Sequence, residues 1–156
     1  MTNVFFPEEE IEKDDLYFVC YMIERVARRL KKRNSYVVNA IGKEELAKLL
    51  SLANVLHSEN PVQVEDEWID KYSLTTGEID VTVVDRELVT EIPRPTQMGK
   101  VYQRLILDTM MPDEDYADGI IRVYNHELCD TIDNYNCSAY YEPSYVIAKA
   151  FHSGGF

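Results

Sequence analysis

The sequence predicts a mainly α-helical protein, folded as one compact multi-helix domain over residues 1–156. Over most of the chain, apolar residues recur at intervals of three and four, the spacing that places them on one side of a helix. Residues 78–92 are the exception, and they allow at most one short strand pair or an extended arm. An apolar content of 46%, with six Gly and six Pro, is typical of a chain that buries a packed core.

The first predicted helix covers residues 7–33. Its apolar stripe consists of Leu16, Val19, Cys20, Ile23, Ala27 and Leu30. The opposite side carries a basic face, which consists of Arg25, Arg28, Arg29 and Lys32. Acidic residues near the start of this helix and basic residues near its end suit the direction of the helix macrodipole.

Two further helices are expected before residue 57. Ser35 caps a short helix over residues 35–41, and Gly42 ends it, since glycine takes a left-handed conformation at low cost. Helical spacing then resumes over residues 43–56. The sequence therefore predicts two short helices that are separated at a glycine.

A clear start signal precedes the next helix. Asn60 is expected as the N-cap and Pro61 as the first helical residue, because this proline lacks only an N–H that would have no partner there. The helix extends to Tyr72 and buries one face, made of Val64, Trp68 and Tyr72.

Between residues 74 and 95 the apolar period changes. Ile79, Val81 and Val83 alternate with polar residues, which is typical of a half-buried strand. Residues 88–92 are its expected partner, although the intervening Asp and Arg are poor residues for a two-residue hairpin turn. An extended arm that crosses the helical body is the alternative.

Three helices are predicted in the C-terminal half. Thr96 caps a helix that ends before Pro112, and an acidic first turn opens a long helix over residues 113–132. The last helix covers residues 143–152 and ends at Gly154.

The composition gives a formal net charge of −12, from 28 acidic and 16 basic residues. Such a charge disfavours general nucleic-acid binding, because affinity for phosphate backbones depends on a cationic footprint. Six of the 16 Lys and Arg lie within residues 25–33, which we call the basic segment. This segment is interpreted as a solvated face, as a contact surface, or as one that an acidic patch of the same chain neutralises.

Cellular location is predicted from the cysteines and the N-terminus. Three Cys, an odd number, favour reduced thiols in the cytoplasm over a disulfide framework. The N-terminus lacks the pattern of a signal peptide, and the longest uncharged apolar run, residues 16–23, is far shorter than the ~20 residues that span a bilayer. A cytoplasmic protein without a membrane partner is expected.

Candidate metal ligands lie near the C-terminus: His126, Cys129, Cys137 and His152. Their spacing, H-x2-C-x7-C-x14-H, lacks the close ligand pairs of structural zinc sites, so ordinary His and Cys side chains are favoured. No nucleotide, zinc-protease or serine-hydrolase motif is present, and no cofactor is expected. The alternative is a small metal- or thiol-dependent enzyme that uses His126, Cys129 and carboxylates such as Asp133.

Tyrosine is concentrated in the C-terminal third of the chain, where six of the eleven Tyr lie within residues 116–145. Tyr is favoured at interfaces because its ring buries a large area and its hydroxyl still forms hydrogen bonds. Core packing of amphipathic helices is expected to account for most of them. The candidates for a partner surface are Tyr135, Tyr140, Tyr141 and Tyr145.

The segments DLYFVCYMIERVARR and GKEELAKLLSLANVLHSENPVQVEDEWIDKY resemble, in hydrophobic patterning, a family of short uncharacterised helical proteins from Gram-positive gut bacteria. The likeness covers about residues 1–75, and residues 78–156 have no counterpart in it. Members of that family are thought to be encoded beside predicted ADP-ribosyltransferase-like toxins. The resemblance therefore implies an accessory or neutralising role.

These observations favour a non-enzymatic acidic interaction module, an antitoxin or inhibitor that binds the basic surface of a partner protein. Its candidate contact surfaces are the basic face of the first helix and the Tyr-rich segment. One alternative is the enzyme that uses the region of His126 and Cys129. Another is a regulatory nucleic-acid contact through the basic segment, and a homo-oligomer is left open.

Overall fold

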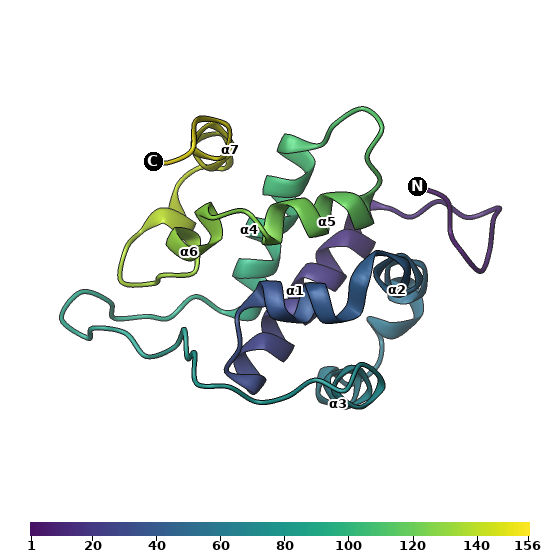
Figure 1. The fold of residues 1–156 in the computed structure, drawn as a ribbon, viewed down its shortest axis with the longest axis horizontal. Helices are drawn as coiled ribbons and strands as arrows, with labels where there is room; N and C mark the ends of the chain where they lie inside the picture. Colours follow the sequence, from purple (N-terminus) through teal and green to yellow (C-terminus); the bar gives the residue numbers. More distant parts are fainter.

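The computed structural model describes residues 1–156 and is mainly helical, as predicted, with no β-sheet. Its elements are α1 (Lys13–Leu30), α2 (Asn34–Leu56), α3 (Pro61–Lys71), α4 (Pro95–Thr109), α5 (Tyr116–Tyr124), α6 (Leu128–Ile132), the 3₁₀ helix η1 (Ala139–Tyr141) and α7 (Ser144–Ser153). Figure 1 shows α1 near the centre, an N-terminal arm at one side and the loop before α4 at the other. None of these helices combines the length and apolar character needed to cross a bilayer.

Helix α1 organises the core, because it packs against α2, α3 and α4. Its predicted apolar stripe is buried, and so are Met22, Val26 and Glu24, so three sides of the helix are covered. A contiguous set of 34 buried apolar residues runs from this helix through the remaining α-helices. The width of this burial explains how a charged residue such as Glu24 comes to lie inside the protein.

The start of α1 lies six residues later than predicted. Residues 1–12 form an arm in which Thr2 and Glu10 make an isolated antiparallel bridge. The helix begins where the Asp15 carboxylate accepts a hydrogen bond from the Glu12 N–H at 2.8 Å. It ends at Leu30, because Lys31 takes a left-handed conformation with φ of 54°.

The two helices expected before residue 57 form one kinked element, α2. Gly42 lies at the kink with φ of 81°, so the predicted positive φ is confirmed there. The N-cap is Arg33 rather than Ser35. The start signal of α3 is also confirmed, since the Asn60 side chain accepts a hydrogen bond from the Val62 N–H at 2.9 Å.

The predicted strand at residues 79–83 is wrong, and the segment between α3 and α4 is the alternative irregular arm. Val83 is 74% exposed, so the alternation does not mark a buried face. The Asp80 carboxylate instead accepts a hydrogen bond from the Thr82 N–H at 3.0 Å, a local turn that competes with strand pairing. This segment between α3 and α4 is held to α1 where the Gly77 N–H donates to the Leu30 carbonyl at 2.7 Å.

Two corrections apply in the C-terminal half. Helix α4 is capped by Arg94, with Pro95 as its first residue, rather than by Thr96. The long helix predicted over residues 113–132 is interrupted, because the Asn125 amide donates back to the Ile121 carbonyl at 2.8 Å and ends α5. The predicted end of α7 is confirmed at Gly154, whose φ is 86°.

Candidate functional site

Ion pairs within the chain occupy most of the basic segment. Arg25 Nε on α1 lies 2.6 Å from Glu65 Oε2 on α3, although the two residues are 40 positions apart in sequence. Arg29 lies 2.7 Å from Asp66 and 3.5 Å from the other oxygen of Glu65. Helix α3 therefore neutralises this side of α1, as one interpretation of the sequence anticipated.

The end of the basic segment is also engaged. Arg33 lies 2.6 Å from Asp130 of α6. The Lys32 ammonium lies 4.3 Å from the centre of the Tyr36 ring, a cation–π contact. Lys31 alone in the segment is exposed without an ion pair or ring contact. Since their charges are already satisfied, these residues offer a nucleic acid little cationic surface.

Arg28 was expected on the exposed basic face, but it is mostly buried beside Glu24, which is 2% exposed. Arg28 Nε donates to Glu24 Oε2 at 2.8 Å, and its terminal nitrogen donates to the Pro93 carbonyl at 2.7 Å. The Tyr135 hydroxyl donates to the same carboxylate at 3.1 Å. Tyr135, predicted as a partner residue, is therefore a buried support for this ion pair.

A second carboxylate lies beside Glu24. The Asn34 amide donates to Glu24 Oε1 at 3.1 Å and to Asp133 Oδ2 at 3.3 Å, so it bridges the two groups. The Tyr102 hydroxyl donates to Asp133 Oδ1 at 2.6 Å. Burial, followed by the charge of Glu24, raises the pKa of Asp133 well above its usual range. The buried polar cluster comprises Glu24, Arg28, Asn34, Tyr102, Asp133 and Tyr135.

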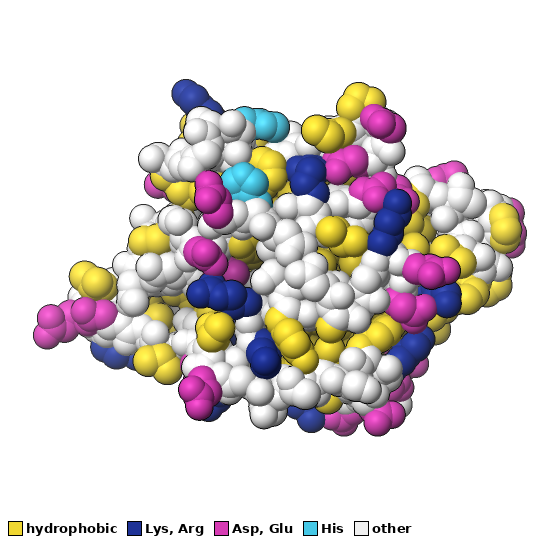
Figure 2. Space-filling model, viewed as in Figure 1, with side chains coloured by type: hydrophobic (Ala, Val, Ile, Leu, Met, Phe, Trp, Pro, Cys, Tyr) yellow, Lys and Arg dark blue, Asp and Glu magenta, His cyan; other side chains and the backbone are white.

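A cavity of about 270 Å³ leads from the surface to this cluster between the start of α2 and α6, and we call it the polar pocket. It is lined by Arg33, Asn34, Ser35, Tyr124, Asn125, His126, Glu127, Cys129, Asp130 and Asp133. The structure therefore brings together His126, Cys129 and Asp133, which the sequence places on one face. Figure 2 shows acidic and basic side chains beside each other over α6 on this side of the molecule.

The other two metal candidates lie away from the polar pocket. Cys137 is in the loop after α6, where its thiol donates to the Thr131 carbonyl at 3.3 Å, and His152 is exposed on α7. No three His, Cys, Asp or Glu side chains are arranged to hold a metal ion. The four candidate metal ligands are thus not brought together.

The thiols near the cluster are poorly suited to nucleophilic chemistry. The Cys129 thiol donates to the Val123 carbonyl at 3.0 Å, and burial raises its pKa to about 12. Burial likewise raises the pKa of Cys20 to about 12. Because the thiolate is the reactive form, these values give no support to a cysteine nucleophile at neutral pH.

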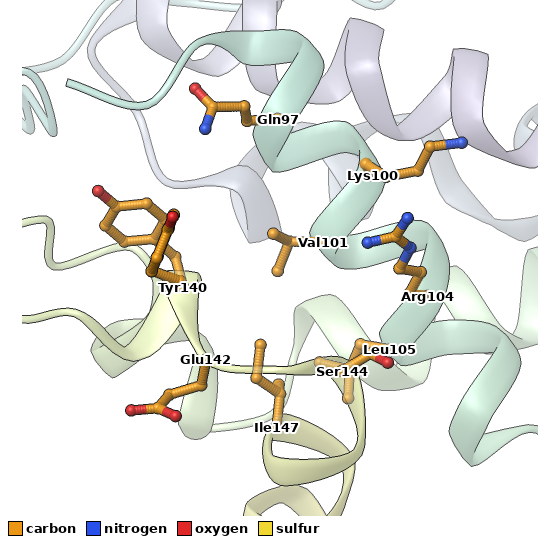
Figure 3. Close-up of a pocket in the computed structure, with 10 residues that line it drawn as sticks. Gln97, Lys100, Val101, Arg104, Leu105, Tyr140, Glu142, Ser144 and Ile147 are labelled. Atoms are coloured by element: carbon orange, nitrogen blue, oxygen red, sulfur yellow. The ribbon is translucent and has the colours of Figure 1, made fainter. Parts of the chain in front are cut away.

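Two of the remaining candidate tyrosines, Tyr140 and Tyr141, line a cleft between α4 and residues 140–147 (Figure 3), and Tyr145 lies outside that lining. Tyr141 and Tyr145 are 78% and 73% exposed, whereas Tyr140 is half-buried. The cleft has a volume of about 270 Å³ and is lined by Gln97, Lys100, Val101, Arg104, Leu105, Tyr140, Tyr141, Glu142, Ser144 and Ile147. Its apolar surface comes mostly from the buried Leu105 and Ile147 and the half-buried Val101 and Tyr140, and no ion pair joins the charged groups of its lining.

A larger hollow, about 530 Å³, lies between the N-terminal arm and the end of α2, and we call it the acidic groove. It is lined by Asn3, Glu9, Glu10, Glu12, Asp14, Asp15, Tyr17, Phe18, Ser51, Ala53, Asn54 and His57. No Lys or Arg lines it, and the one ion pair of its carboxylates joins Glu10 to the N-terminal amine at 3.4 Å. In the sequence these acidic residues indicate only a helix start, so the groove was not predicted.

The shape of the acidic groove depends on Asn3, which is buried. Its amide donates to the Ser51 carbonyl at 2.9 Å, and its side-chain oxygen accepts from the Phe5 and Phe6 N–H groups at 2.9 Å. These bonds hold the arm against α2 and leave both Phe rings exposed. Figure 2 shows apolar and acidic side chains together on the protruding arm.

Comparison with known proteins gives no relatives: no family model, curated protein or solved structure matches this chain.

Proposed function

We propose that the protein is a non-enzymatic interaction module whose acidic groove binds a basic surface of a partner protein. The observation that carries this proposal is the convergence of five carboxylates on one groove that no Lys or Arg lines. Four of the five have no ion pair. Such a surface attracts a cationic partner over long range and orients it before contact.

Charge pairing over the whole molecule supports this direction. Ion pairs engage eight of the 28 carboxylates, counting the one at the N-terminus, and eight of the 16 Lys and Arg. The uncompensated charge is therefore mostly negative. A partner that contributes cations relieves the repulsion within the groove, whereas an acidic partner or a nucleic acid increases it.

Apolar side chains beside the acidic groove supply the second requirement of a stable interface. Val4, Phe5 and Phe6 are all exposed on the arm, although large apolar groups are usually buried. Aromatic side chains at the centre of an interface commonly provide much of its binding energy. The arm therefore offers anchors next to the charges that set the orientation.

An antitoxin or inhibitor that covers a basic active site in the cytoplasm is the role that we propose for this surface. It agrees with the neutralising role that the family resemblance implies. Binding through the groove requires no cofactor and no catalytic group. The exposed Tyr141 and Tyr145 provide additional contact area for a large partner.

The test compares two double variants with the same change in net charge. Glu9→Gln with Asp14→Asn removes two groove charges, and Glu67→Gln with Asp70→Asn removes two exposed charges from α3. Each protein is used as bait in lysate of the source cells, and the recovered partner is purified and titrated. We expect roughly tenfold weaker binding by the groove variant alone, or about 1.4 kcal/mol.

Equal weakening by both variants would show that only net charge matters. Unchanged binding by the groove variant would contradict the proposal. The salt dependence of the association rate provides a second measurement, because electrostatic steering is screened at high ionic strength. The rate for the wild type is expected to fall more steeply with salt than the rate for the groove variant.

A further inference from the structure

The buried polar cluster contains two carboxylates and one cation. Arg28 pairs with Glu24 at 2.8 Å, whereas Asp133 has no ion pair. Both hydrogen bonds to Asp133 come from neutral groups, the Tyr102 hydroxyl and the Asn34 amide. A carboxylate in this setting either stays protonated or requires a cation from outside the chain.

Asp133 lies at the edge of the buried polar cluster, where the polar pocket reaches it, so its carboxyl group is mostly enclosed but partly exposed to the pocket. Asn34 lines the same pocket, and both of its hydrogen bonds to the carboxylates use the amide nitrogen. Its amide oxygen is therefore turned away from them and remains an acceptor. The inner part of the pocket thus combines a carboxylate and an amide oxygen, both of which accept hydrogen bonds.

Tyr124 shows that one polar group in the pocket wall has no hydrogen-bond partner within the chain. It lines the polar pocket, is 2% exposed, and its buried hydroxyl has no hydrogen-bond partner. Its ring stacks on Tyr102 with 4.4 Å between the ring centres, so it is held in place. Buried polar groups normally have partners, so this hydroxyl, which lies beside the buried Cys20 thiol, is an exception in the pocket wall.

The rim of the pocket is also negative. Glu127 and Asp130 are exposed there, and Arg33, the one Lys or Arg of the lining, is already paired with Asp130 at 2.6 Å. His126 is engaged as well, since its ring nitrogen Nδ1 accepts a hydrogen bond from the Leu128 N–H at 3.0 Å. The pocket therefore has acidic groups at two depths, with Asp133 inside and Glu127 and Asp130 outside.

We propose that the polar pocket binds a small organic diamine, with one ammonium group on Asp133 and the other at the rim near Glu127 and Asp130. An ammonium group has three donors and no acceptor, which matches an inner wall of acceptors. A metal ion fits less well, because no three ligating side chains are grouped there. The volume of about 270 Å³ suits a small molecule rather than a polymer segment.

The test is a titration of the full chain with 1,4-diaminobutane, followed by calorimetry and by backbone amide NMR. We expect saturable binding, with the largest shift changes at the amides of Asn34, Cys129 and Asp133. Asp133→Asn should weaken binding at least tenfold, because it removes the carboxyl group that can give up its proton to pair with an ammonium group, and it keeps the size of the side chain. Asp70→Asn on α3 is the matched control and should leave binding unchanged.

Absence of saturable binding to the wild type would overturn the proposal, and so would equal binding by Asp133→Asn. Shift changes confined to the acidic groove would also overturn it, because they indicate general attraction of cations. If Asp133→Asn fails to fold, the shift map of the wild type and a titration with n-butylamine remain decisive. The monoamine is expected to bind at least fivefold more weakly, since it lacks the group that reaches the rim.

This proposal and the acidic groove are tested separately. Glu9→Gln with Asp14→Asn lies outside the polar pocket and should bind the diamine normally. Asp133→Asn lies outside the acidic groove and should bind the partner protein normally. Failure of one proposal therefore leaves the other standing.

Discussion

Two charged regions lie at opposite ends of α1: the basic segment at its end, and the carboxylates of the acidic groove near its start. Most of the basic side chains form ion pairs within the chain, whereas most of the acidic side chains do not. The basic segment finds partners on α3, α6 and within α1 itself, at distances of 2.6 to 3.5 Å. The acidic residues face a hollow that no Lys or Arg lines, and only Glu10 among them has an ion pair, with the N-terminal amine. Charge density in a sequence thus shows where charges are, and only tertiary structure shows which of them remain available to a partner.

The largest effect on stability is expected at the buried ion pair between Arg28 and Glu24. Glu24→Ala leaves the Arg28 guanidinium without its carboxylate in the protein interior. We expect the free energy of unfolding to fall by about 3–5 kcal/mol, as is usual when one member of a buried ion pair is removed. Urea denaturation measures this change.

A double variant separates charge from packing at the same place. Replacing both Glu24 and Arg28 by Met removes the pair together and should restore a substantial part of the lost stability. A loss below about 1 kcal/mol for Glu24→Ala would mean that Arg28 finds other solvation, and would contradict the description of a buried pair.

The next effect concerns pH. Burial raises the pKa of Asp133 above the value near 3.9 in the unfolded chain, so above about pH 4 the folded protein keeps a proton that the unfolded chain has lost. Stability from this group therefore declines with increasing pH until the folded pKa is passed. The slope is up to about 1.4 kcal/mol per pH unit. Chemical denaturation of wild type and Asp133→Asn between pH 4.5 and 7 measures it, and parallel profiles would refute the raised pKa.

A smaller effect is expected at the exposed end of the basic segment. Arg29 pairs with Asp66, but both side chains are substantially exposed. Arg29→Ala should lower the free energy of unfolding by about 1 kcal/mol or less, because exposed ion pairs contribute little. A loss comparable to that of Glu24→Ala, measured in the same denaturation series, would erase the distinction between the two parts of the segment.

The smallest change in stability is predicted for the acidic groove. Glu9→Gln with Asp14→Asn should alter the free energy of unfolding by about 0.5 kcal/mol or less, since relief of repulsion offsets a weaker helix N-terminus. Thermal and urea unfolding provide the measurement. A marked loss would assign these carboxylates a structural role instead of a binding one.

Local signals in the sequence predicted the helices well. Apolar periodicity located α1, α4 and α7, and short-range chemistry identified Asn60 as a cap and Gly42 as a positive-φ position. The failures arose where side chains compete for the backbone. Asp80 turns the chain at a predicted strand, and Asn125 interrupts a predicted helix.

The candidate sites were less predictable, because they depend on contacts between distant segments. Glu24 looks like an ordinary polar position of α1, and its burial depends on Tyr135, which lies 111 residues later. The grouping of His126, Cys129 and Asp133 was visible from helical spacing, but the pocket also needs Asn34 from α2. The acidic groove required knowledge of how Asn3 folds the arm onto Ser51.

The ion pair of Glu24 and Arg28 depends on residues that are synthesised much later, and this affects when α1 can complete its packing. A ribosome adds about 5–20 residues per second, so roughly 5–20 s separate the synthesis of α1 from that of Tyr135. Early in that interval the ion pair lacks two of its hydrogen-bonding neighbours, the Pro93 carbonyl and the Tyr135 hydroxyl. The Pro93 carbonyl becomes available first, and the Tyr135 hydroxyl follows. The final packing of α1 therefore has to wait until Tyr135 has been synthesised.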